Sequence, residues 1–341
     1  MIKEIRYKNF KALRDATLPL GRFTLIVGAN GTGKSTAIKA LEIVKKPQNI
    51  RLEEIVSTEL SDFDNPIVSL NIKIDEINLT ATWRNKSDKF GQLSFEIMKN
   101  SEQHTDKAIG ESHQKVFNEW ITDFSLYSFD AEKIAQIVRI NGKKELDADG
   151  GNLAGILDLL KDTEPERWQE LNNELERWFP EFDQVLFDRN DEGKYIVLRT
   201  KFGKHKIKAK DLSDGTRIAL AYLTLAYLPN PPKIVAFEEP ERGIHPRLLQ
   251  NIQEAMYRLA YPENYGEKRE PIQVIATTHS PYLLDLYKDY PEEIVIADKD
   301  ENGVHFQNLA QMKNIDKILQ GGESLGEVWF TGILGGVPAH I

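Results

Sequence analysis

The chain has 341 residues, of which 40% are hydrophobic and 28% are charged, so it can bury a large core and has the composition of a globular protein. Its formal net charge is −9 and it contains no cysteine, which excludes disulfides, thiolate metal sites and a surface that binds nucleic acid everywhere. It has no apolar stretch of membrane-spanning length and no signal-peptide pattern at the N-terminus, so we expect a cytoplasmic protein.

Strand and helix patterns alternate at both ends of the chain. The first 45 residues predict strands at 1–8 and 22–27 and a helix at 34–45. Alternation of this kind is typical of a parallel sheet covered by helices. In the second half the pattern predicts strands at 183–188, 194–200, 203–210, 233–238, 272–278 and 293–298 and helices at 214–228, 246–260 and 281–287.

The middle of the chain has a different pattern. Residues 66–74, 77–84 and 92–98 read as strands of an antiparallel meander, and residues 104–180 are mostly helical in pattern, with a helix at 153–161. We therefore predict an α/β fold with a mixed sheet. Its core would comprise residues 1–46 and 183–341, and residues 47–182 would be an insertion made of a β meander and a helical subdomain.

Residues 28–35, GANGTGKS, match the P-loop pattern G-x-x-x-x-G-K-[ST] between a predicted strand and a predicted helix. Glycines at this spacing let backbone N–H groups face phosphate oxygens, and the helix N-terminus adds its positive dipole end. Lys34 would reach the β- and γ-phosphates, and the Ser35 hydroxyl would hold Mg²⁺. The glycine spacing differs from that of a dinucleotide-binding turn. We expect ATP and Mg²⁺ as cofactors, bound through Asn30, Gly31, Thr32, Gly33, Lys34, Ser35 and Thr36.

A row of acids, in the segment FEEPERGIHP at 237–246, ends another apolar run. A buried carboxylate is costly unless a metal or another partner takes up its charge. In a P-loop protein an acid at the end of a second strand holds Mg²⁺, which predicts this role for Glu238. Glu239 would accept a proton from the attacking water. The alternative is an acidic turn before the helix at 246–260, and this suffices for Glu241.

Two further polar motifs are found next to predicted strands and helices. His279 follows the strand at 272–278 and would donate to the γ-phosphate, although Ser280 and Pro281 also mark an ordinary helix start. Ser213 and Gly215, in LSDGT, lie at the start of the helix at 214–228 and predict a second anion site. The alternative for that motif is a capped helix.

In this order the motifs resemble those of ABC-type "AAA family" ATPases of the RecF/SMC-like and OLD-like branch. GANGTGKS resembles the Walker A motif, LSDGT the signature motif, IVAFEEPERGIHP the Walker B motif with its D-loop, and TTHSP the H-switch. The opening IRYKNFKAL resembles the first strand and turn of that branch, and the tail GESLGEVWFTGILGGVP resembles the endings of compact bacterial members. The resemblance covers residues 1–45 and 195–341.

The resemblance implies a Mg²⁺-dependent ATPase that acts as a switch. Two heads of a homodimer sandwich two ATP molecules, and Ser213 and Gly215 of one subunit contact the γ-phosphate bound by the other. Glu239 activates water, and His279 senses the γ-phosphate. The switch would control a separate DNA-acting or nuclease partner, for example a Toprim-type protein, in DNA repair or anti-phage defence. DNA is a further expected ligand class, and no membrane contact is expected.

The sequence departs from the family pattern at several positions. Glu238 stands where the Walker B acid is usually Asp, the signature reads LSDGT rather than LSGGQ, and no long coiled coil or Toprim module is present. No Q-loop glutamine is assigned, and Gln92 and Gln136 are the nearest by order. Three alternatives stay open: an ABC-transporter subunit, a small-molecule kinase and a non-hydrolysing, ATP-locked scaffold.

Four lysines precede the signature motif at every second residue, which would place them on one face of a strand. One interpretation is that the lysines protect an edge strand, and the alternative is that they contact DNA phosphates. We favour the first interpretation because the chain is acidic overall. The four lysines are Lys204, Lys206, Lys208 and Lys210.

Overall fold

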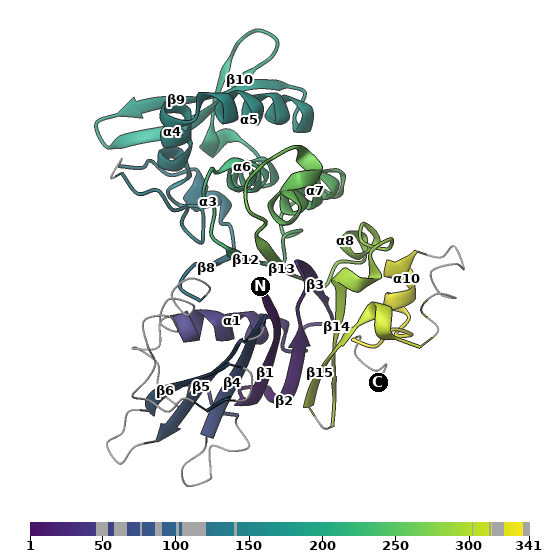
Figure 1. The fold of residues 1–341 in the computed structure, drawn as a ribbon. Helices are drawn as coiled ribbons and strands as arrows, with labels where there is room; N and C mark the ends of the chain where they lie inside the picture. The colour runs from purple at the N-terminus through teal and green to yellow at the C-terminus, as the bar shows by residue number, and fades with distance from the viewer. Residues whose placement is uncertain are drawn as a thin grey trace. The chain divides into compact units, whose positions relative to one another are not determined.

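A computed structural model gives the architecture of the protein (Figure 1). It describes residues 1–45, 54–57, 67–75, 77–85, 91–99, 102–103, 121–139, 142–301, 303–313, 315 and 324–336. The chain divides into two compact units, and the backbone passes from one to the other four times. The first unit is Met1–Leu126, Lys233–Ala236 and Gln273–Ile341, and the second is Tyr127–Pro232 and Phe237–Ile272. The predicted division into core and insertion stays a prediction.

The first unit is built around a six-stranded mixed sheet with the order β15-β14-β3-β13-β12-β8. β3 pairs in parallel with both β13 and β14, whereas β14 and β15 are antiparallel. Every residue of β3 and β13 is buried, as expected for strands covered on both faces. The strands are β3 (Phe23–Val27), β8 (Phe124–Tyr127), β12 (Ile234–Glu238), β13 (Gln273–Thr278), β14 (Ile294–Asp300) and β15 (Gly303–Asn308).

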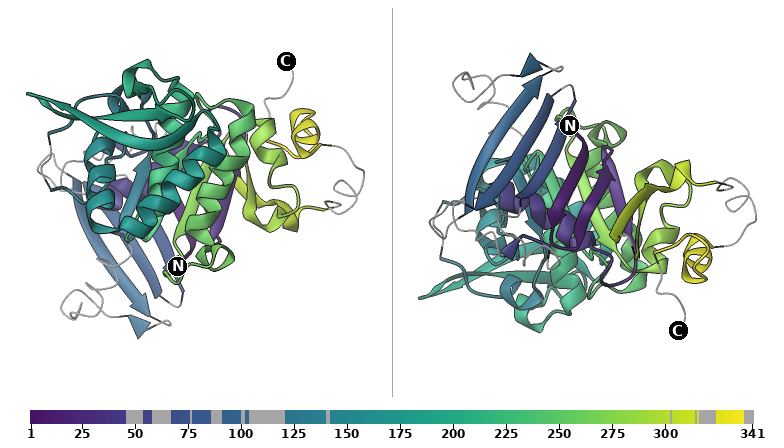
Figure 2. Two further views of the ribbon diagram at one scale, coloured as in Figure 1. Left: turned by 90° about the horizontal axis from the view of Figure 1, so that it is seen from above. Right: turned by 90° about the horizontal axis from the view of Figure 1, so that it is seen from below.

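A second six-stranded sheet of the same unit is antiparallel, with the order β2-β1-β4-β5-β6-β7. The right-hand view of Figure 2 shows these strands side by side in purple and blue. The structure confirms the meander predicted over 66–98. The strands are β1 (Ile2–Phe10), β2 (Leu13–Pro19), β4 (Ile67–Ile74), β5 (Ile77–Asn85), β6 (Gly91–Lys99) and β7 (Glu102–Gln103).

Helix α1 (Lys34–Lys45) packs its apolar face into the core of the first unit. Ala37, Ile38 and Leu41 lie on that face, and their spacing by three and four residues is the reason the segment is an amphipathic helix. Two short helices, α8 (Pro281–Asp285) and α10 (Leu325–Phe330), lie near the C-terminal end of the same unit. The helix predicted at 34–45 is therefore confirmed.

Gln273, the first residue of β13, is fully buried and ties the start of the chain to the sheet. Its Oε1 accepts a hydrogen bond from the Ile2 N–H at 2.9 Å. Its Nε2 donates to the Ile2 carbonyl at 2.7 Å and to the Gly21 carbonyl at 2.7 Å. One amide thus binds three backbone groups, two of which belong to the buried residue Ile2.

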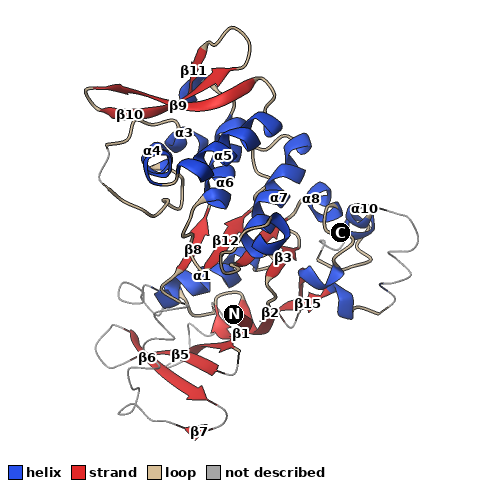
Figure 3. Ribbon diagram, turned by 45° about the horizontal axis from the view of Figure 1, so that its top comes forward, coloured by secondary structure: helices blue, strands red, loops and turns tan. Residues whose placement is uncertain are grey.

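The second unit combines helices with a three-stranded antiparallel sheet of order β11-β10-β9. α5 packs on β9, α4 on β10, and α6 packs against α7 (Figure 3). Within the described part of the chain, no helix is both long and apolar enough to cross a membrane. The elements are α3 (Ala131–Ile134), α4 (Leu153–Thr163), α5 (Pro165–Trp178), β9 (Phe182–Asn190), β10 (Gly193–Thr200), β11 (Lys206–Lys208), α6 (Asp214–Tyr227) and α7 (Leu249–Ala260).

The helical character predicted over 104–180 is confirmed for its described part by α3, α4 and α5, while residues 104–120 lie outside the described residues. The pattern missed β8, because a four-residue strand is too short to show a period. It also missed β2 and β15, which pair antiparallel with β1 and β14.

The prediction of four lysines on one strand face is wrong. Strand β11 is only three residues long, so Lys206 and Lys208 alone lie on it. Lys204 has a φ of 53°, in the left-handed region of a turn, and Lys210 lies in a 3-10 helix. β11 is the edge of its sheet, and its two lysines are exposed, so the edge-protection interpretation holds for them.

Asp183 on β9 binds two cations, the Arg199 Nε at 2.8 Å and the Lys204 Nζ. The hydrogen bonds from Arg199 and then Lys204 lower the pKa of Asp183 from 3.8 to about 2. A carboxyl group whose pKa is lower in the folded state than in the unfolded state stabilises the folded state at pH values above its ordinary pKa. That stabilisation is lost as the pH falls through the folded value.

We therefore expect Asp183→Asn to be less stable than the wild type by a constant amount above about pH 4, and this difference to shrink between about pH 4 and pH 2. Urea unfolding at a series of pH values measures it. The control is Asp188→Asn, at the exposed end of the same strand, where Oδ1 accepts from the Arg189 N–H at 3.0 Å. A difference for Asp183→Asn that does not change with pH would contradict the assignment.

Candidate functional site

Residues 28–33 form the loop between β3 and α1 in the first unit, at the position predicted for a P-loop, and residues 34–36 begin α1. Gly31 and Gly33 have φ values of 84° and 82°, a region that residues with a side chain rarely adopt. These two glycines let the loop curl back before α1 begins. Asn30, Gly31 and Ser35 are exposed, so the curled face of the loop is open to a ligand.

Lys34, the first residue of α1, is folded onto this loop and is only 6% exposed. Its Nζ donates to the carbonyls of Gly28 at 2.6 Å and Ala29 at 2.8 Å. The Thr32 hydroxyl also donates to the Ala29 carbonyl, at 2.9 Å. The first turn of a helix leaves backbone N–H groups without an intrahelical acceptor. An ammonium group and these N–H groups together favour a bound anion.

His279 lies next to the start of the P-loop in the first unit. β13 runs parallel to β3 with Thr278 opposite Val27, and the Gly28 N–H donates to the Thr278 carbonyl at 3.4 Å. His279 follows directly and is exposed. Ser280 caps α8 by accepting from the Leu283 N–H at 3.4 Å, so the helix-start interpretation is confirmed and uses a different side chain.

The signature residues begin α6 in the second unit. The Ser213 hydroxyl accepts from the Thr216 N–H at 3.1 Å, which confirms the capped-helix interpretation, and the Ser213 residue is exposed. A Cβ added at Gly215 would lie 2.9 Å from the Gly243 carbonyl. The start of α6 therefore packs closely on the turn that follows the acidic row.

The acidic row continues from the end of β12 into a turn of the second unit. Glu238 is the last residue of the strand and is half-buried. Glu239 has a φ of 47°, a left-handed conformation that costs a residue with a side chain about 1–3 kcal/mol. Strain of this kind persists where the surrounding structure fixes it, and it often occurs at functional sites.

Glu241 lies close to helix α6. Burial, together with the negative charge of Glu241, raises the pKa of Tyr222 well above its ordinary value. The Tyr222 hydroxyl therefore keeps its proton across the physiological range. The Ile244 N–H donates to the Glu241 carbonyl at 3.0 Å, and His245 caps the following 3-10 turn. These contacts fit the interpretation of Glu241 as part of an acidic turn.

The predicted site residues fall into two groups. The P-loop and His279 belong to the first unit, whereas Ser213, Gly215 and Glu239 belong to the second. β12 leads from the first unit into the second, and in the sheet order β13 lies between β3 and β12. The assignment of one joint site to both groups stays a prediction. Gln136 follows α3, the side chain of Gln92 lies outside the described ones, and no Q-loop residue is assigned.

The position of the C-terminal segment beside the P-loop was not predicted from the sequence. The Ala29 N–H donates to the Gly336 carbonyl at 2.5 Å, although the two residues are far apart in the chain. The one local sequence signal for this contact is the pair of consecutive glycines, Gly335 and Gly336. A backbone that approaches another backbone closely needs residues without a side chain.

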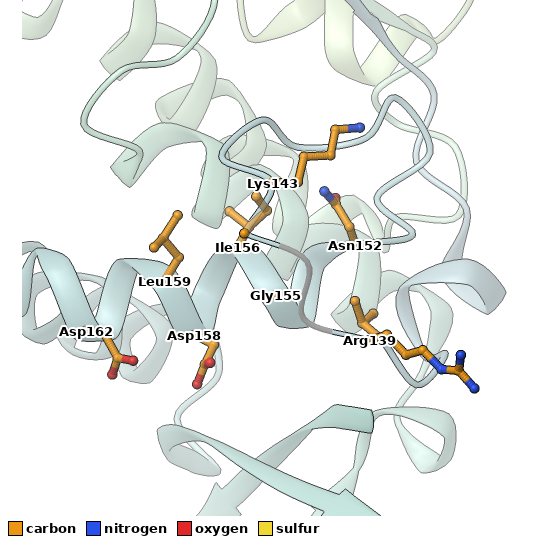
Figure 4. Close-up of a pocket in the computed structure, with 10 residues that line it drawn as sticks. Arg139, Lys143, Asn152, Gly155, Ile156, Asp158, Leu159 and Asp162 are labelled. Atoms are coloured by element: carbon orange, nitrogen blue, oxygen red, sulfur yellow. The ribbon is translucent and has the colours of Figure 1, made fainter. Parts of the chain in front are cut away.

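A cavity of about 120 Å³ lies beside α4 in the second unit (Figure 4). Arg139 and Lys143 line it together with Asp158 and Asp162 of α4. The Asp158 carboxylate already accepts from the Lys194 Nζ at 2.6 Å. No predicted site residue lines this cavity, so it is separate from the candidate site.

The family described as "AAA domain, putative AbiEii toxin, Type IV TA system" matches residues 73–285, which is more than half of the chain. The protein belongs to this AAA domain family. The matched residues of this AAA domain protein include Ser213, Gly215, Glu238, Glu239 and His279 and begin after the P-loop.

One curated relative is the OLD nuclease of Thermus scotoductus, which is 50% identical over 44 residues. The aligned segment is 13% of this chain and 8% of the relative, so the AAA domain protein spans only a small part of that nuclease.

Two solved structures are similar over most of the AAA domain protein. The SMC head domain from Thermotoga maritima is 16% identical with a TM-score of 0.48, over 90% of this chain and 98% of that chain. The recombination mediator protein RecF, in a structure titled RecF-ATPrS, is 12% identical with a TM-score of 0.46, over the same shares of 90% and 98%. Identities this low say nothing about the residues of the site.

The family match confirms the predicted resemblance to the AAA family, and the segment shared with an OLD nuclease agrees with its OLD-like part. The mixed sheet, the antiparallel meander and the strand–loop–helix unit of β3 and α1 confirm the predicted α/β fold class.

Proposed function

We propose that this AAA domain protein is a Mg²⁺-dependent ATPase of the cytoplasm that works as a switch, and that ATP-driven dimerisation of its heads controls a separate partner. The observation that carries the proposal is the geometry of the P-loop. Gly31 and Gly33 curl the loop in front of α1, and the Lys34 ammonium lies at the base of that curl. This is the backbone shape and the charge that a triphosphate requires.

The residues around the loop fit ATP and Mg²⁺. Lys34 would exchange two backbone carbonyls for phosphate oxygens, and Asn30 to Thr36 would supply backbone N–H groups. Ser35, exposed on the first turn of α1, and Glu238 would hold Mg²⁺. In the described part of the chain no three acidic or histidine side chains gather as a metal site of their own. This suits Mg²⁺, which binds through one or two protein ligands, phosphate oxygens and water.

Glu239 is proposed as the general base and His279 as the group that contacts the γ-phosphate. A carboxylate can take the proton of an attacking water, and an imidazole N–H can donate to a phosphate oxygen. The bound nucleotide supplies the phosphoanhydride that is cleaved. The left-handed backbone at Glu239 supports this assignment, because it fixes the direction of the side chain at the end of β12.

Dimerisation would complete the site. Ser213 and Gly215, at the N-terminus of the 14-residue helix α6, are proposed to bind the γ-phosphate held by a second copy of the chain. The N-terminus of α6 carries the positive end of the helix dipole, which favours an anion.

The proposed partner is a separate DNA-acting or nuclease protein, with a role in DNA repair or anti-phage defence. The name of the Thermus scotoductus relative, an OLD nuclease, supports a link to nuclease chemistry. Co-purification of the tagged protein with a soluble nuclease would support this proposal, and co-purification with a membrane permease would contradict it.

ATP binding is tested by titration calorimetry with ATP and Mg²⁺ on the wild type and on Lys34→Ala. We expect the substitution to weaken binding by about 10- to 100-fold, because it removes charge-assisted hydrogen bonds worth about 1.5–3 kcal/mol. The control is Lys39→Ala, which removes the same charge from the exposed side of α1 and should bind like the wild type.

If the wild type binds no ATP, or if Lys34→Ala and Lys39→Ala bind equally well, the ATP site is not where we place it. Release of phosphate in the absence of any acceptor distinguishes an ATPase from a small-molecule kinase.

A further inference from the structure

Residues 324–336, which we call the C-terminal strap, run from helix α8 to the P-loop within the first unit. The strap consists of α10 (Leu325–Phe330) and the turns that follow it. It is anchored by burial of Leu325, Val328, Trp329 and Leu334, each no more than 5% exposed.

One end of the strap is fixed to α8. The Ser324 hydroxyl hydrogen-bonds to the Asp285 carboxylate, at 2.7 and 2.9 Å to its two oxygens, and the Gly326 N–H donates to it at 2.8 Å. A Cβ added at Gly326 would lie 2.6 Å from the Pro281 carbonyl, so α10 touches the α8 backbone directly. α8 and α10 lie side by side in Figure 1.

The other end is fixed to the P-loop. The Gly336 carbonyl accepts the Ala29 N–H at 2.5 Å. Gly336 has a φ of 69°, and an added Cβ would lie 2.9 Å from the Ala297 carbonyl and 3.4 Å from the Gly28 Cα. Both the backbone conformation and the space therefore exclude a side chain at this position.

Both backbone polar groups of Ala29, its N–H and its carbonyl, are thus hydrogen-bonded. The strap binds its N–H, while Lys34 and Thr32 donate to its carbonyl. When Lys34 turns towards a phosphate, the Ala29 carbonyl loses one of these donors. The bond from Gly336 does not involve any group that the phosphates would bind, so it can persist in both states.

We propose that the strap is a positioning element of the nucleotide site, in which Gly336 keeps the P-loop curled after Lys34 has moved to the nucleotide. It also links the P-loop to α8, the helix that begins directly after His279. The proposal rests on the proposed ATP-binding function of the same loop.

The test compares Gly336→Ala with Gly266→Ala, a control outside the strap. Both glycines have left-handed backbones, with φ values of 69° and 72°, so alanine strains each to a similar degree. At Gly266, however, an added Cβ meets nothing within 4 Å. We expect Gly336→Ala to weaken ATP binding about tenfold, the effect of losing one buried hydrogen bond, and Gly266→Ala to bind like the wild type.

A second readout needs no nucleotide. Amide hydrogen exchange at Ala29 should be faster in Gly336→Ala than in both Gly266→Ala and the wild type. Ser324→Ala, which keeps the glycine turn and removes the hydroxyl bonded to Asp285, should also speed exchange at Ala29, to a smaller extent. This variant serves if Gly336→Ala does not fold.

Equal exchange at Ala29 in the wild type, Gly336→Ala and Ser324→Ala would overturn the proposal, and so would equal ATP affinities of Gly336→Ala and Gly266→Ala. If the wild type binds no ATP, the proposed function fails. In that case the exchange comparison still shows whether the strap holds the loop.

Discussion

Glu239→Gln is expected to lower the rate of ATP hydrolysis by about 10²- to 10⁴-fold, because an amide cannot accept the proton that a general base removes from water. Glutamine has the size of glutamate and the same difficulty with a φ of 47°, so the fold should be unaffected. ATP binding should persist. Because hydrolysis would open the dimer, the variant should accumulate as an ATP-bound dimer, visible by light scattering with and without ATP.

The matched control is Glu241→Gln, which removes a carboxylate two residues away in the same turn. Since we place Glu241 in a structural acidic turn, this variant should hydrolyse ATP at nearly the wild-type rate. Wild-type hydrolysis by Glu239→Gln would exclude Glu239 as the base. Lost hydrolysis in both variants would show that the turn, rather than one carboxylate, is required.

Gln273→Ala is expected to lower the free energy of unfolding by about 2–6 kcal/mol. The truncation leaves the two buried backbone groups of Ile2 without the amide that satisfies them, and each such group costs about 1–3 kcal/mol. Denaturant-induced unfolding measures the change.

Gln307→Ala provides the control for this prediction, because Gln307 is an exposed glutamine on β15 of the same unit. A surface substitution of this kind changes stability by no more than about 0.5 kcal/mol. If Gln273→Ala were no less stable than Gln307→Ala, the buried amide would not be a tie between the chain start and the sheet.

Local signals explain what could be predicted from the sequence. β3, the P-loop and α1 were predictable because an apolar run, a glycine pattern and a helical period follow one another within 25 residues of chain, roughly the span of one strand–loop–helix unit. β12 and β13 were predictable for a similar reason, as apolar runs that end in polar residues.

Features that depend on distant residues could not be predicted. The hydrogen bond from the Ala29 N–H to the Gly336 carbonyl joins residues near opposite ends of the chain, and no local sequence pattern predicts it. The left-handed backbone of Glu239 is set by its surroundings and not by its residue type. The lysine spacing failed as a strand signal because a turn at Lys204 and a 3-10 helix at Lys210 interrupt it.

The repeated crossing of the backbone between the two compact units has a consequence for anyone who wishes to isolate either of them. The connections fall after Leu126, Pro232, Ala236 and Ile272. One proteolytic cut, or one truncation at either terminus, cannot release a whole unit as a continuous polypeptide. Separate production of the second unit would need a new linker between 232 and 237, in place of the four residues that belong to the first.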